Sequence, residues 1–510
     1  MVAVKTFTMS ALVPQNLLHI AGAWRPPASG AALPVVDPAT REPFHSSGRA
    51  GAEDVDAAVA AAREAYPAWS RMSPSDRGAI LGRWSQLIFE HVEELARYEA
   101  QDVGKPLSDA RTNIFIAGSI LGYFAGAADK LHGATLPSRS ADNTGFTLRE
   151  SLGVCAMVIA WNVPAILMMA DAAPALAAGN TVVLKPSEHA PMSPLALTAL
   201  SVEAGLPPGV LNVVTGLGGE AGQPLTSHKG INHISFVGSS ATGRAIMASA
   251  ARNLTPVKLE LGGKSPNVVF ADADLDAAVP AILESIVENA GQNCYAGSRL
   301  LIEAPVYDEV VARLAAAMEA VKAGPWHEDL DMGPLVNQVQ HERVSDYLRG
   351  GVAGGARVVT GGPNDRRPSN RGPSDRGPSN QGPSSREGWY VRPTLFDQVT
   401  PDMPIVREEI FGPVLAAESF QTAREAVDRV NATPYGLLVS VWTNDLSRAL
   451  RVVREVRSGQ VSVNEFANSA IIGFPFNLAK ESGFSQGGGY EAMKEYTSEK
   501  GVSIKMRPLG

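Results

Sequence analysis

The sequence predicts an α/β fold with two domains, the first of them a doubly wound sheet, and a small β extension. Three observations support this prediction. The chain has 510 residues, which is too long for one ordinary core. From about residue 150, short apolar runs alternate with helical patterns, as in parallel sheets covered on both faces. The C-terminal run 501–506 alternates in the way a strand does.

The elements can be placed in order along the chain. Helices are expected over 54–65 and 76–99, where apolar residues recur at spacings of three and four, as in outer helices with one buried face. Strands are expected at 153–160, 180–184, 210–214, 233–237 and 257–261. After Gly262 a second series begins, with strands at 267–270 and 299–303 and a helix at 307–322.

The change of series near residues 260–263 sets the expected domain boundaries. The first domain comprises 1–127 and 151–262, and the second comprises 263–477. The segments 128–150 and 478–510 form the β extension, because a terminal strand of this kind often pairs outside its own domain. We expect it to pair between subunits and to give a homodimer or a homotetramer.

One segment, 363–387, breaks the pattern with repeats of Arg-Gly-Pro-Ser. Proline, glycine and serine without apolar residues cannot bury a core, so a disordered, passive loop expansion is expected. The alternative is a basic tract that binds an acidic partner.

Composition excludes several classes of protein. Lys and Arg number 44 against 52 Asp and Glu, a net charge of −8, so nucleic acid is not an expected partner. Two cysteines indicate a reducing, cytoplasmic location without disulfides. The apolar stretch 154–178 contains Asn162, Pro164 and Asp171, which favours a buried strand and helix over a membrane span. No metal site and no membrane association are expected.

The chemistry is expected at Cys294, which lies in Gly-Gln-Asn-Cys-Tyr-Ala-Gly, and at Glu260, 34 positions earlier. A thiol among small residues is a candidate covalent nucleophile, and the carboxylate is a candidate base. Taken alone, such a cysteine more often packs as an inert, buried thiol.

The order of six motifs along the chain decides whether Cys294 is a nucleophile or an inert, buried thiol. The six motifs are Trp161-Asn162-Val163-Pro164, Lys185-Pro186-Ser187-Glu188, Phe236-Val237-Gly238-Ser239 with Gly243, Glu260-Leu261-Gly262-Gly263-Lys264-Ser265-Pro266, Gly291-Gln292-Asn293-Cys294 and Glu408-Glu409-Ile410-Phe411-Gly412-Pro413-Val414. This order resembles the aldehyde dehydrogenase superfamily, of the NAD(P)-dependent, hydrolytic type. The resemblance runs from about residue 17 to 506, without the Arg-Gly-Pro-Ser segment.

The resemblance implies a catalytic role for three residues. Cys294 attacks the aldehyde carbonyl, and Asn162 and the backbone N–H of Cys294 hold the resulting oxyanion. Glu260 activates the water that hydrolyses the thioester. Relatives that pass the acyl group to coenzyme A typically lack this carboxylate, so Glu260 favours hydrolysis to a free acid.

The resemblance also implies that NAD is the cofactor. The helix that begins at Gly238 and Ser239, with Gly243 following, suits a pyrophosphate. Glu188 accepts hydrogen bonds from ribose hydroxyls but repels a 2′-phosphate, which favours NAD over NADP. The implied cofactor contacts are Trp161, Lys185, Ser187, Glu188, Gly238, Ser239, Gly243, Leu261, Gly262, Glu409 and Phe411. The glycine-rich run 216–221 resembles a dinucleotide fingerprint and is expected to be a plain turn.

The substrate is expected to be a small aldehyde without charge. The implied tunnel residues are Val163, Leu167, Met168, Tyr295, Phe466 and Phe476, a set without an Arg to bind a second carboxylate. The chain departs from the family at Asp171 and Gly487, where many hydrolytic members have a lysine and a glutamate involved in proton movement. The alternatives are a coenzyme A-acylating enzyme, an NADP-linked semialdehyde dehydrogenase and a non-catalytic scaffold.

Overall fold

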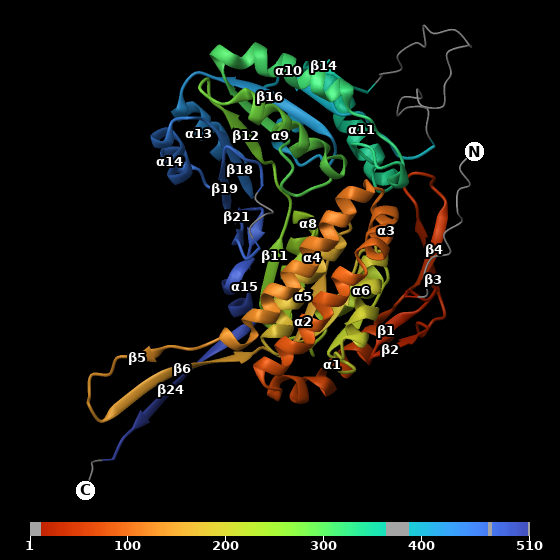
Figure 1. Ribbon diagram of the computed structural model, residues 1–510, viewed down its shortest axis with the longest axis vertical. Helices are drawn as coiled ribbons and strands as arrows, with labels where there is room; N and C mark the ends of the chain where they lie inside the picture. The colour runs from red at the N-terminus through yellow and green to blue at the C-terminus, as the bar shows by residue number, and fades with distance from the viewer. Residues whose placement is uncertain (1–11, 364–386, 468–471, 508–510) are drawn as a thin grey trace.

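The computed structural model describes residues 12–363, 387–467 and 472–507. The expected loop expansion at 363–387 lies almost wholly outside these residues. Within them the chain forms two sheets with helices on both faces and a projecting arm (Figure 1). The predicted α/β class is therefore confirmed.

The first sheet has a doubly wound centre. Its order, counted over the described residues, is β2 (Ala23–Arg25), β1 (Leu18–Ile20), β9 (Leu211–Val213), β8 (Thr181–Lys185), β7 (Val154–Val158), β10 (His233–Val237), β11 (Val257–Glu260) and β22 (Gly483–Phe484). The five strands from β9 to β11 are parallel, and the outer strands are antiparallel. The strand order reverses at β7, which lies between β8 and β10.

Two apolar clusters cover the two faces of this sheet. Successive residues of β7, such as Cys155 and Ala156, belong to different clusters because side chains alternate across a strand. One face carries α2 (Pro74–Glu90), α3 (Val92–Val103), α4 (Leu107–Ala127), α5 (Pro164–Ala177) and α6 (Met192–Glu203). The other carries α1 (Ala52–Arg71), α7 (Gln223–Ser227) and α8 (Ser240–Ala250).

Two local predictions were wrong. The helix expected over 76–99 is divided at His91, whose φ of −106° and ψ of 17° are not helical. Glu93 and Glu94 follow it in the first turn of α3, where acidic side chains stabilise a new helix N-terminus. The run 216–221 is not a plain turn, because Gly218–Gly222 form a π-helical turn that leads into α7.

The second sheet is also mostly parallel. Its order is β14 (Arg357–Thr360), β15 (Thr394–Asp397), β16 (Val414–Phe420), β13 (Arg299–Glu303), β12 (Pro266–Val269), β18 (Leu438–Trp442) and β19 (Gln460–Val463) among the residues described. One face packs against α9 (Leu275–Val287), α10 (Tyr307–Ala320), α11 (Gln338–Ala353) and α12 (Pro404–Arg407). The opposite face packs against α13 (Ala423–Asn431) and α14 (Leu446–Glu455).

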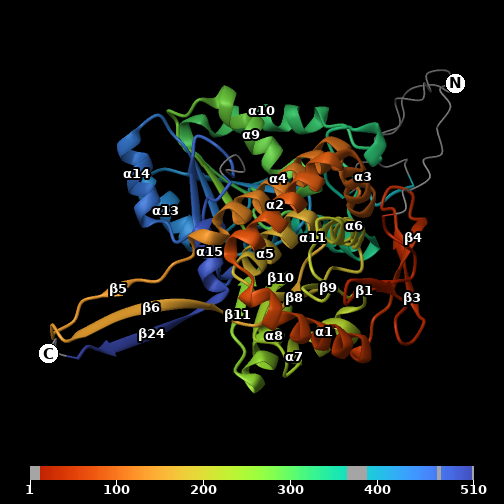
Figure 2. The ribbon, with the colours of Figure 1, turned by 60° about the horizontal axis from the view of Figure 1, so that its bottom comes forward.

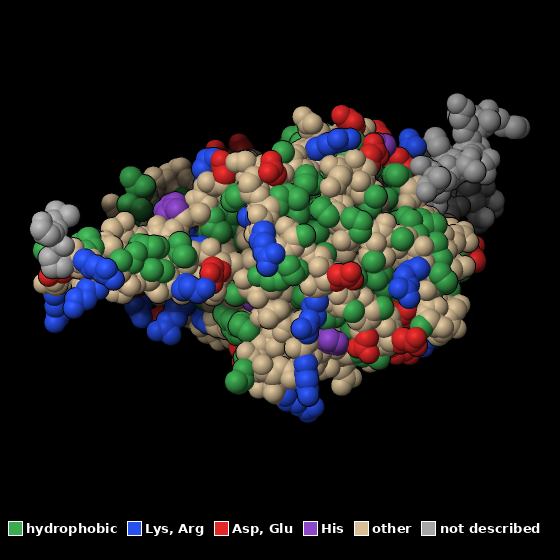
Figure 3. Space-filling view, turned by 90° about the horizontal axis from the view of Figure 1, so that it is seen from below, with side chains coloured by type: hydrophobic (Ala, Val, Ile, Leu, Met, Phe, Trp, Pro, Cys, Tyr) green, Lys and Arg blue, Asp and Glu red, His purple; other side chains and the backbone are tan. Residues whose placement is uncertain are grey.

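The arm is a three-stranded sheet that projects from the two domains (Figure 2). Its central strand β6 (Asn143–Ser151) pairs with β5 (Thr135–Leu136) and, over nine residue pairs, with β24 (Thr497–Lys505). A view from below shows hydrophobic side chains along it (Figure 3). The strand predicted at the C-terminus thus pairs with the segment predicted to accompany it.

The segment before β24 returns to the two domains instead of joining the arm. β22 pairs with β11, and β21 (Ala479–Lys480) pairs with β17 (Tyr435–Gly436) of the second domain. β20 (Phe476–Asn477) pairs with β23 (Gln486–Gly487), and α15 (Gly489–Glu495) follows. A separate hairpin joins β3 (Ala32–Val36) and β4 (Pro43–Gly48). Among the described helices, none is both long enough and apolar enough to cross a bilayer.

Candidate active site

The candidate site lies at the carboxyl ends of the parallel strands in the first sheet. Asn162 follows β7, Gly238 follows β10, and Glu260 ends β11. Open α/β sheets bind ligands outside the carboxyl ends of their strands, at the place where the strand order reverses. The turning point at β7 therefore positions a crevice beside these three residues.

A cavity of about 640 Å³ opens there between the two domains. It brings together fifteen of the residues expected to form the site. They are Trp161, Asn162, Val163, Leu167, Gly238, Ser239, Glu260, Leu261, Gly262, Cys294, Tyr295, Glu409, Phe411, Phe466 and Phe476. The expected residues that do not line it are Met168, Lys185, Ser187, Glu188 and Gly243. Met168 is fully buried, and Gly243 packs against Leu261.

Cys294 lies on the loop between the 3-10 turn Glu288–Gly291 and β13, and it is half-buried. Burial raises the pKa of its thiol above the ordinary value, and the negative charges of Glu260 and Glu409 raise it further. The backbone amides of Tyr295 and Cys294 partly oppose this shift. The resting group is therefore a thiol, so its reaction requires a base. The other cysteine, Cys155, is buried inside β7 away from the cavity.

The backbone of Asn162 is held in place by two buried donors. Its carbonyl oxygen accepts a hydrogen bond from Lys105 Nζ at 2.9 Å and one from Asn289 Nδ2 at 3.0 Å. Lys105 is paired in turn with Glu99 at 3.3 Å, and neither side chain is exposed. Among the described residues no partner takes up the side-chain amide of Asn162, which lines the cavity. That amide is therefore available to an oxyanion.

Glu260 has a basic neighbour that the motifs did not indicate. Its Oε1 lies 3.0 Å from Lys258 Nζ. Burial raises the pKa of Glu260, Lys258 opposes this shift, and Asp171 reinforces it. Gly487 lies against the same carboxylate, because a Cβ at that position would lie 3.1 Å from Glu260 Oε1. A side chain at 487 would therefore have to displace the carboxylate.

The part of the cavity beside α8 has the features expected for a dinucleotide. Ser239 caps α8, and its side chain accepts a hydrogen bond from Thr242 N at 3.2 Å. The free amides of this helix end and its dipole favour an anion. At the end of β8, the buried Lys185 Nζ lies 3.4 Å from Glu188 Oε2, and burial lowers the pKa of Lys185.

Glu409 and Phe411 line the part of the cavity that lies between the two domains. Glu409 Oε1 accepts a hydrogen bond from Gly263 N at 3.0 Å, and burial raises the pKa of Glu409 to about 7. The ring of Phe411 meets that of Trp161 edge to face, with centroids 5.3 Å apart. A donor from α11, Gln340 Nε2, binds Phe411 O at 2.7 Å and fixes the backbone there. The two motifs, 250 positions apart, thus meet at one point of the cavity.

The part of the cavity beside α4 and α9 is aromatic, and its wall is acidic. Asp109, Glu284 and Glu288 line it, and none of the three was expected. Burial and the charge of Asp109 raise the pKa of Glu288 to about 7. Glu288 Oε2 accepts hydrogen bonds from Asn293 Nδ2 at 3.1 Å and Tyr295 OH at 3.4 Å. The only signal in the sequence was the position of Glu288, six residues before Cys294.

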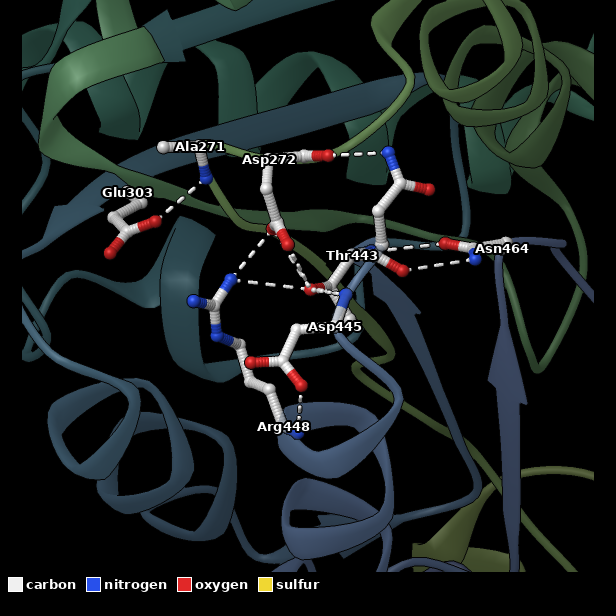
Figure 4. Close-up of polar contacts among 8 residues, drawn as sticks. Ala271, Asp272, Glu303, Thr443, Asp445, Arg448 and Asn464 are labelled. Atoms are coloured by element: carbon white, nitrogen blue, oxygen red, sulfur yellow. Dashed lines mark hydrogen bonds and ion pairs between the residues drawn. The ribbon is translucent and has the colours of Figure 1, made fainter.

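The described residues at the carboxyl edge of the second sheet form a polar network (Figure 4). Asp272, which follows β12, accepts hydrogen bonds from Arg448 Nη1 at 2.6 Å and from Thr443 Oγ1 at 2.9 Å. Asn464, after β19, exchanges hydrogen bonds with the backbone of Thr443. Because these groups pair with one another, the network joins the strand ends and α14.

Comparisons with known proteins agree with one another over nearly the whole chain. The sequence profile of the aldehyde dehydrogenase family matches residues 24–502. Aldehyde dehydrogenase 1 of Tanacetum cinerariifolium is 41% identical over 492 residues, covering 95% of this chain and 94% of that protein. Retinal dehydrogenase 2 of Mus musculus is 39% identical over 496 residues, covering 96% and 92%. The structure of an aldehyde dehydrogenase from Bacillus cereus in complex with NAD+ matches with a TM-score of 0.91 at 36% identity, covering 97% of each chain.

Proposed function

Because the chain belongs to the aldehyde dehydrogenase family, we propose that it oxidises an aldehyde to a carboxylic acid with NAD, through a covalent intermediate on Cys294. One observation supports this proposal above the others. Cys294, Asn162 and Glu260 come from three distant segments, and all three line one cavity. This set supplies a nucleophile, an oxyanion donor and a base, the three groups that acyl transfer to water requires.

In the first half-reaction, Glu260 takes the thiol proton of Cys294 as Sγ bonds to the aldehyde carbon, and Glu260 then releases this proton to solvent. The carbonyl electron pair moves to oxygen, where the Asn162 amide and the backbone N–H of Cys294 stabilise it. Bound NAD supplies the hydride acceptor. Loss of hydride from this carbon leaves a thioester on Cys294. Glu260 then takes a proton from water, the oxygen of which attacks the thioester, and the C–S bond breaks to release the acid.

We propose that the first domain holds NAD, with its pyrophosphate at Ser239 and its nicotinamide ribose at Glu409. The free helix end at Ser239 and the fixed carboxylate at Glu409 lie on the same cavity and fit these parts of the dinucleotide. Glu188, beside Lys185, favours ribose hydroxyls over a 2′-phosphate. The Bacillus cereus relative crystallised with NAD+ supports the same choice.

We propose a substrate without negative charge. Asp109, Glu284 and Glu288 line the cavity beside α4 and α9, whereas the cations that line it, Lys258 and Arg343, contact Glu260 and Glu409. Burial and mutual repulsion raise the pKa of Asp109 to about 6 and that of Glu288 to about 7, so a further carboxylate on the substrate would be unfavourable beside them. Tyr295 and Phe466, whose ring centroids are 6.1 Å apart, offer apolar surface to an aliphatic or aromatic chain instead.

We propose that the arm pairs with a second copy of the chain, in a homodimer or homotetramer located in the cytoplasm. Leu136, Leu148, Ile504 and Met506 on the arm are each 44–46% exposed. An exposed apolar sheet with open edges is a typical subunit contact. The mass by light scattering should be two or four times that of the chain, and Ile504→Asp should reduce it. A monomeric wild type would contradict this proposal.

The covalent step is tested by replacing each cysteine in turn. Cys294→Ala should bind NAD with wild-type affinity and form no NADH, because the sulfur that attacks the aldehyde carbonyl is gone. Cys155→Ala is the matched control and should keep its turnover, because Cys155 lies outside the cavity. NADH formation by Cys294→Ala at the wild-type rate would eliminate the covalent route.

The substrate is tested with aldehydes of one chain length that end in a methyl group, a carboxylate or an ammonium group. We expect the carboxylate to lower kcat/KM most, and we expect Glu288→Gln to reduce that penalty because it removes one repelling charge. Equal kcat/KM for the methyl and carboxylate aldehydes would show that the acidic wall does not select the substrate.

A further inference from the structure

A row of three buried charges ends at the proposed base. Lys258 Nζ lies 2.7 Å from Asp171 Oδ1 on one side and 3.0 Å from Glu260 Oε1 on the other. The side chains of Asp171 and Lys258 are 2% and 1% exposed, whereas that of Glu260 is 14% exposed. The ammonium group is therefore shared by two carboxylates, and only the outer carboxylate is open to the cavity.

The strand geometry explains why the row forms. Lys258 and Glu260 are two positions apart on β11, so their side chains point to the same face of the sheet. Asp171 comes from α5, which packs on that face. Its Oδ2 accepts a hydrogen bond from Ser235 Oγ at 2.6 Å, and its Oδ1 accepts one from Tyr496 OH at 3.1 Å. Asp171 is thus held by two further elements, and it anchors the lysine independently of Glu260.

We infer that Lys258, anchored by Asp171, is the positioning residue that orients Glu260 and keeps it ionised as the base. This inference rests on the proposed role of Glu260 in hydrolysing the thioester. The 3.0 Å contact ties Oε1 to the ammonium group and fixes the orientation of the carboxylate at the cavity.

The surrounding charges agree with this role. Burial lowers the pKa of Lys258, but Asp171 and Glu260 reverse this effect and raise it well above its ordinary value. Glu495 and Tyr496 act on Lys258 in the same direction. Lys258 therefore stays an ammonium ion through the reaction, paired with Asp171, while Glu260 gains and loses its proton.

The other titratable groups near the row do not replace Lys258. Cys294 and Glu495 both interact with Glu260, and each is neutral or negative. His233 is near Asp171 and Lys258, and burial lowers its pKa to about 4, so it is neutral at pH 7. Gly487, which faces Glu260, has no side chain. Lys258 is the one cation that contacts Glu260 among the residues described.

The test is the pH profile of thioester hydrolysis. Lys258→Met keeps the length of the side chain and removes its charge, and Lys258→Met/Asp171→Asn also removes the carboxylate that would be left unpaired. In Lys258→Met we expect the acidic limb of kcat to move up by about one to three pH units, since an adjacent opposite charge lowers a carboxyl pKa by that amount. In the double variant we expect a smaller upward shift, because Asp171, which raises the pKa of Glu260, is also gone. The NADH burst of the first turnover should persist, and the acyl-enzyme should accumulate at pH 7. Lys130→Met, at an exposed position, is the control and should keep the wild-type profile.

Three results separate this inference from a structural role and from the proposed function. A folded Lys258→Met variant with an unshifted acidic limb would show that Lys258 only stabilises the fold. If Glu260→Gln keeps wild-type turnover, the proposed base itself is wrong. If neither Lys258 variant folds, infrared difference spectra of wild type and Glu260→Gln decide on the intact enzyme. A carboxylate band for Glu260 at pH 7 supports the inference, and a protonated carboxyl band refutes it.

Discussion

Replacing Lys105 by methionine should damage catalysis from a position outside the cavity. Lys105 Nζ donates to Asn162 O at 2.9 Å and lies 3.3 Å from Glu99 Oε1. Glu99 uses its other oxygen to accept hydrogen bonds from Ala165 N at 3.1 Å and Ser193 Oγ at 3.0 Å. One fully buried ion pair therefore holds both Asn162, the proposed oxyanion donor, and the first turn of α5.

The size of the effect follows from this geometry. Removing one partner of a buried ion pair leaves the other charge uncompensated and costs about 3–5 kcal/mol. For catalysis, Asn162 keeps only the hydrogen bond from Asn289 on its carbonyl oxygen. Since a misplacement of about 1 Å lowers rates by about 100-fold, we expect kcat/KM of Lys105→Met to fall by about 10- to 100-fold.

A double variant separates stability from catalysis. In Glu99→Gln/Lys105→Met the buried carboxylate is gone, and the amide oxygen still serves Ala165 N and Ser193. Calorimetry should show that this variant regains much of the lost stability, whereas stopped-flow NADH formation should show that kcat/KM stays low. If kcat/KM recovers together with the melting temperature, or if folded Lys105→Met reacts at the wild-type rate, Lys105 does not position Asn162.

Two further predictions concern the cofactor side and acid stability. Gly262→Ala places a Cβ 2.3 Å from Glu409 Oε2, so titration calorimetry should show weaker NAD binding, and thermal unfolding should show a stability loss of about 1–3 kcal/mol. Gly218→Ala is the control, because a Cβ there has no atom within 4 Å. Equal NAD affinities for the two variants would contradict the argument. Burial lowers the pKa of His19 from 6.5 to about 4, so as the pH falls the imidazole is protonated in the unfolded chain before it is protonated in the folded chain. The free energy of unfolding is therefore highest above pH 6.5 and falls by up to about 3 kcal/mol as the pH drops toward 4. His19→Asn should flatten this part of the denaturation profile, and an unchanged slope would assign the acid loss to other groups.

Regular strands of the sheets could be predicted closely because their patterns are local. The strands expected at 233–237 and 299–303 have those bounds in the structure. The two-residue strands β17 and β20–β23 could not be predicted in this way, because two residues have no periodicity. β22 pairs with β11 across more than 200 positions, so only the folded chain shows that this segment completes the first sheet.

In the candidate site, the sequence motifs pointed to residues that lie within short, recognisable runs, such as Asn162 and Cys294. They missed Asp109 and Glu288, which lie in or next to helices. A charged residue in a helical pattern usually faces solvent, and periodicity does not distinguish a face toward water from a face toward a cavity. Tertiary structure makes that distinction, since these two carboxyl groups come from helices on different sheets and meet in one wall.

Asp171 shows how a residue change can be misinterpreted when each position is considered alone. Because the family pattern that the sequence resembles often has a lysine there, the aspartate considered alone suggests that the proton of Glu260 moves by another route. In the folded chain the positive charge is on β11 instead, where Lys258 lies 2.7 Å from Asp171 and 3.0 Å from Glu260. A buried carboxylate at 171 needs a partner, so the aspartate itself makes a lysine at 258 favourable. The two positions therefore have to be interpreted together, as one unit that keeps a cation beside the proposed base, Glu260.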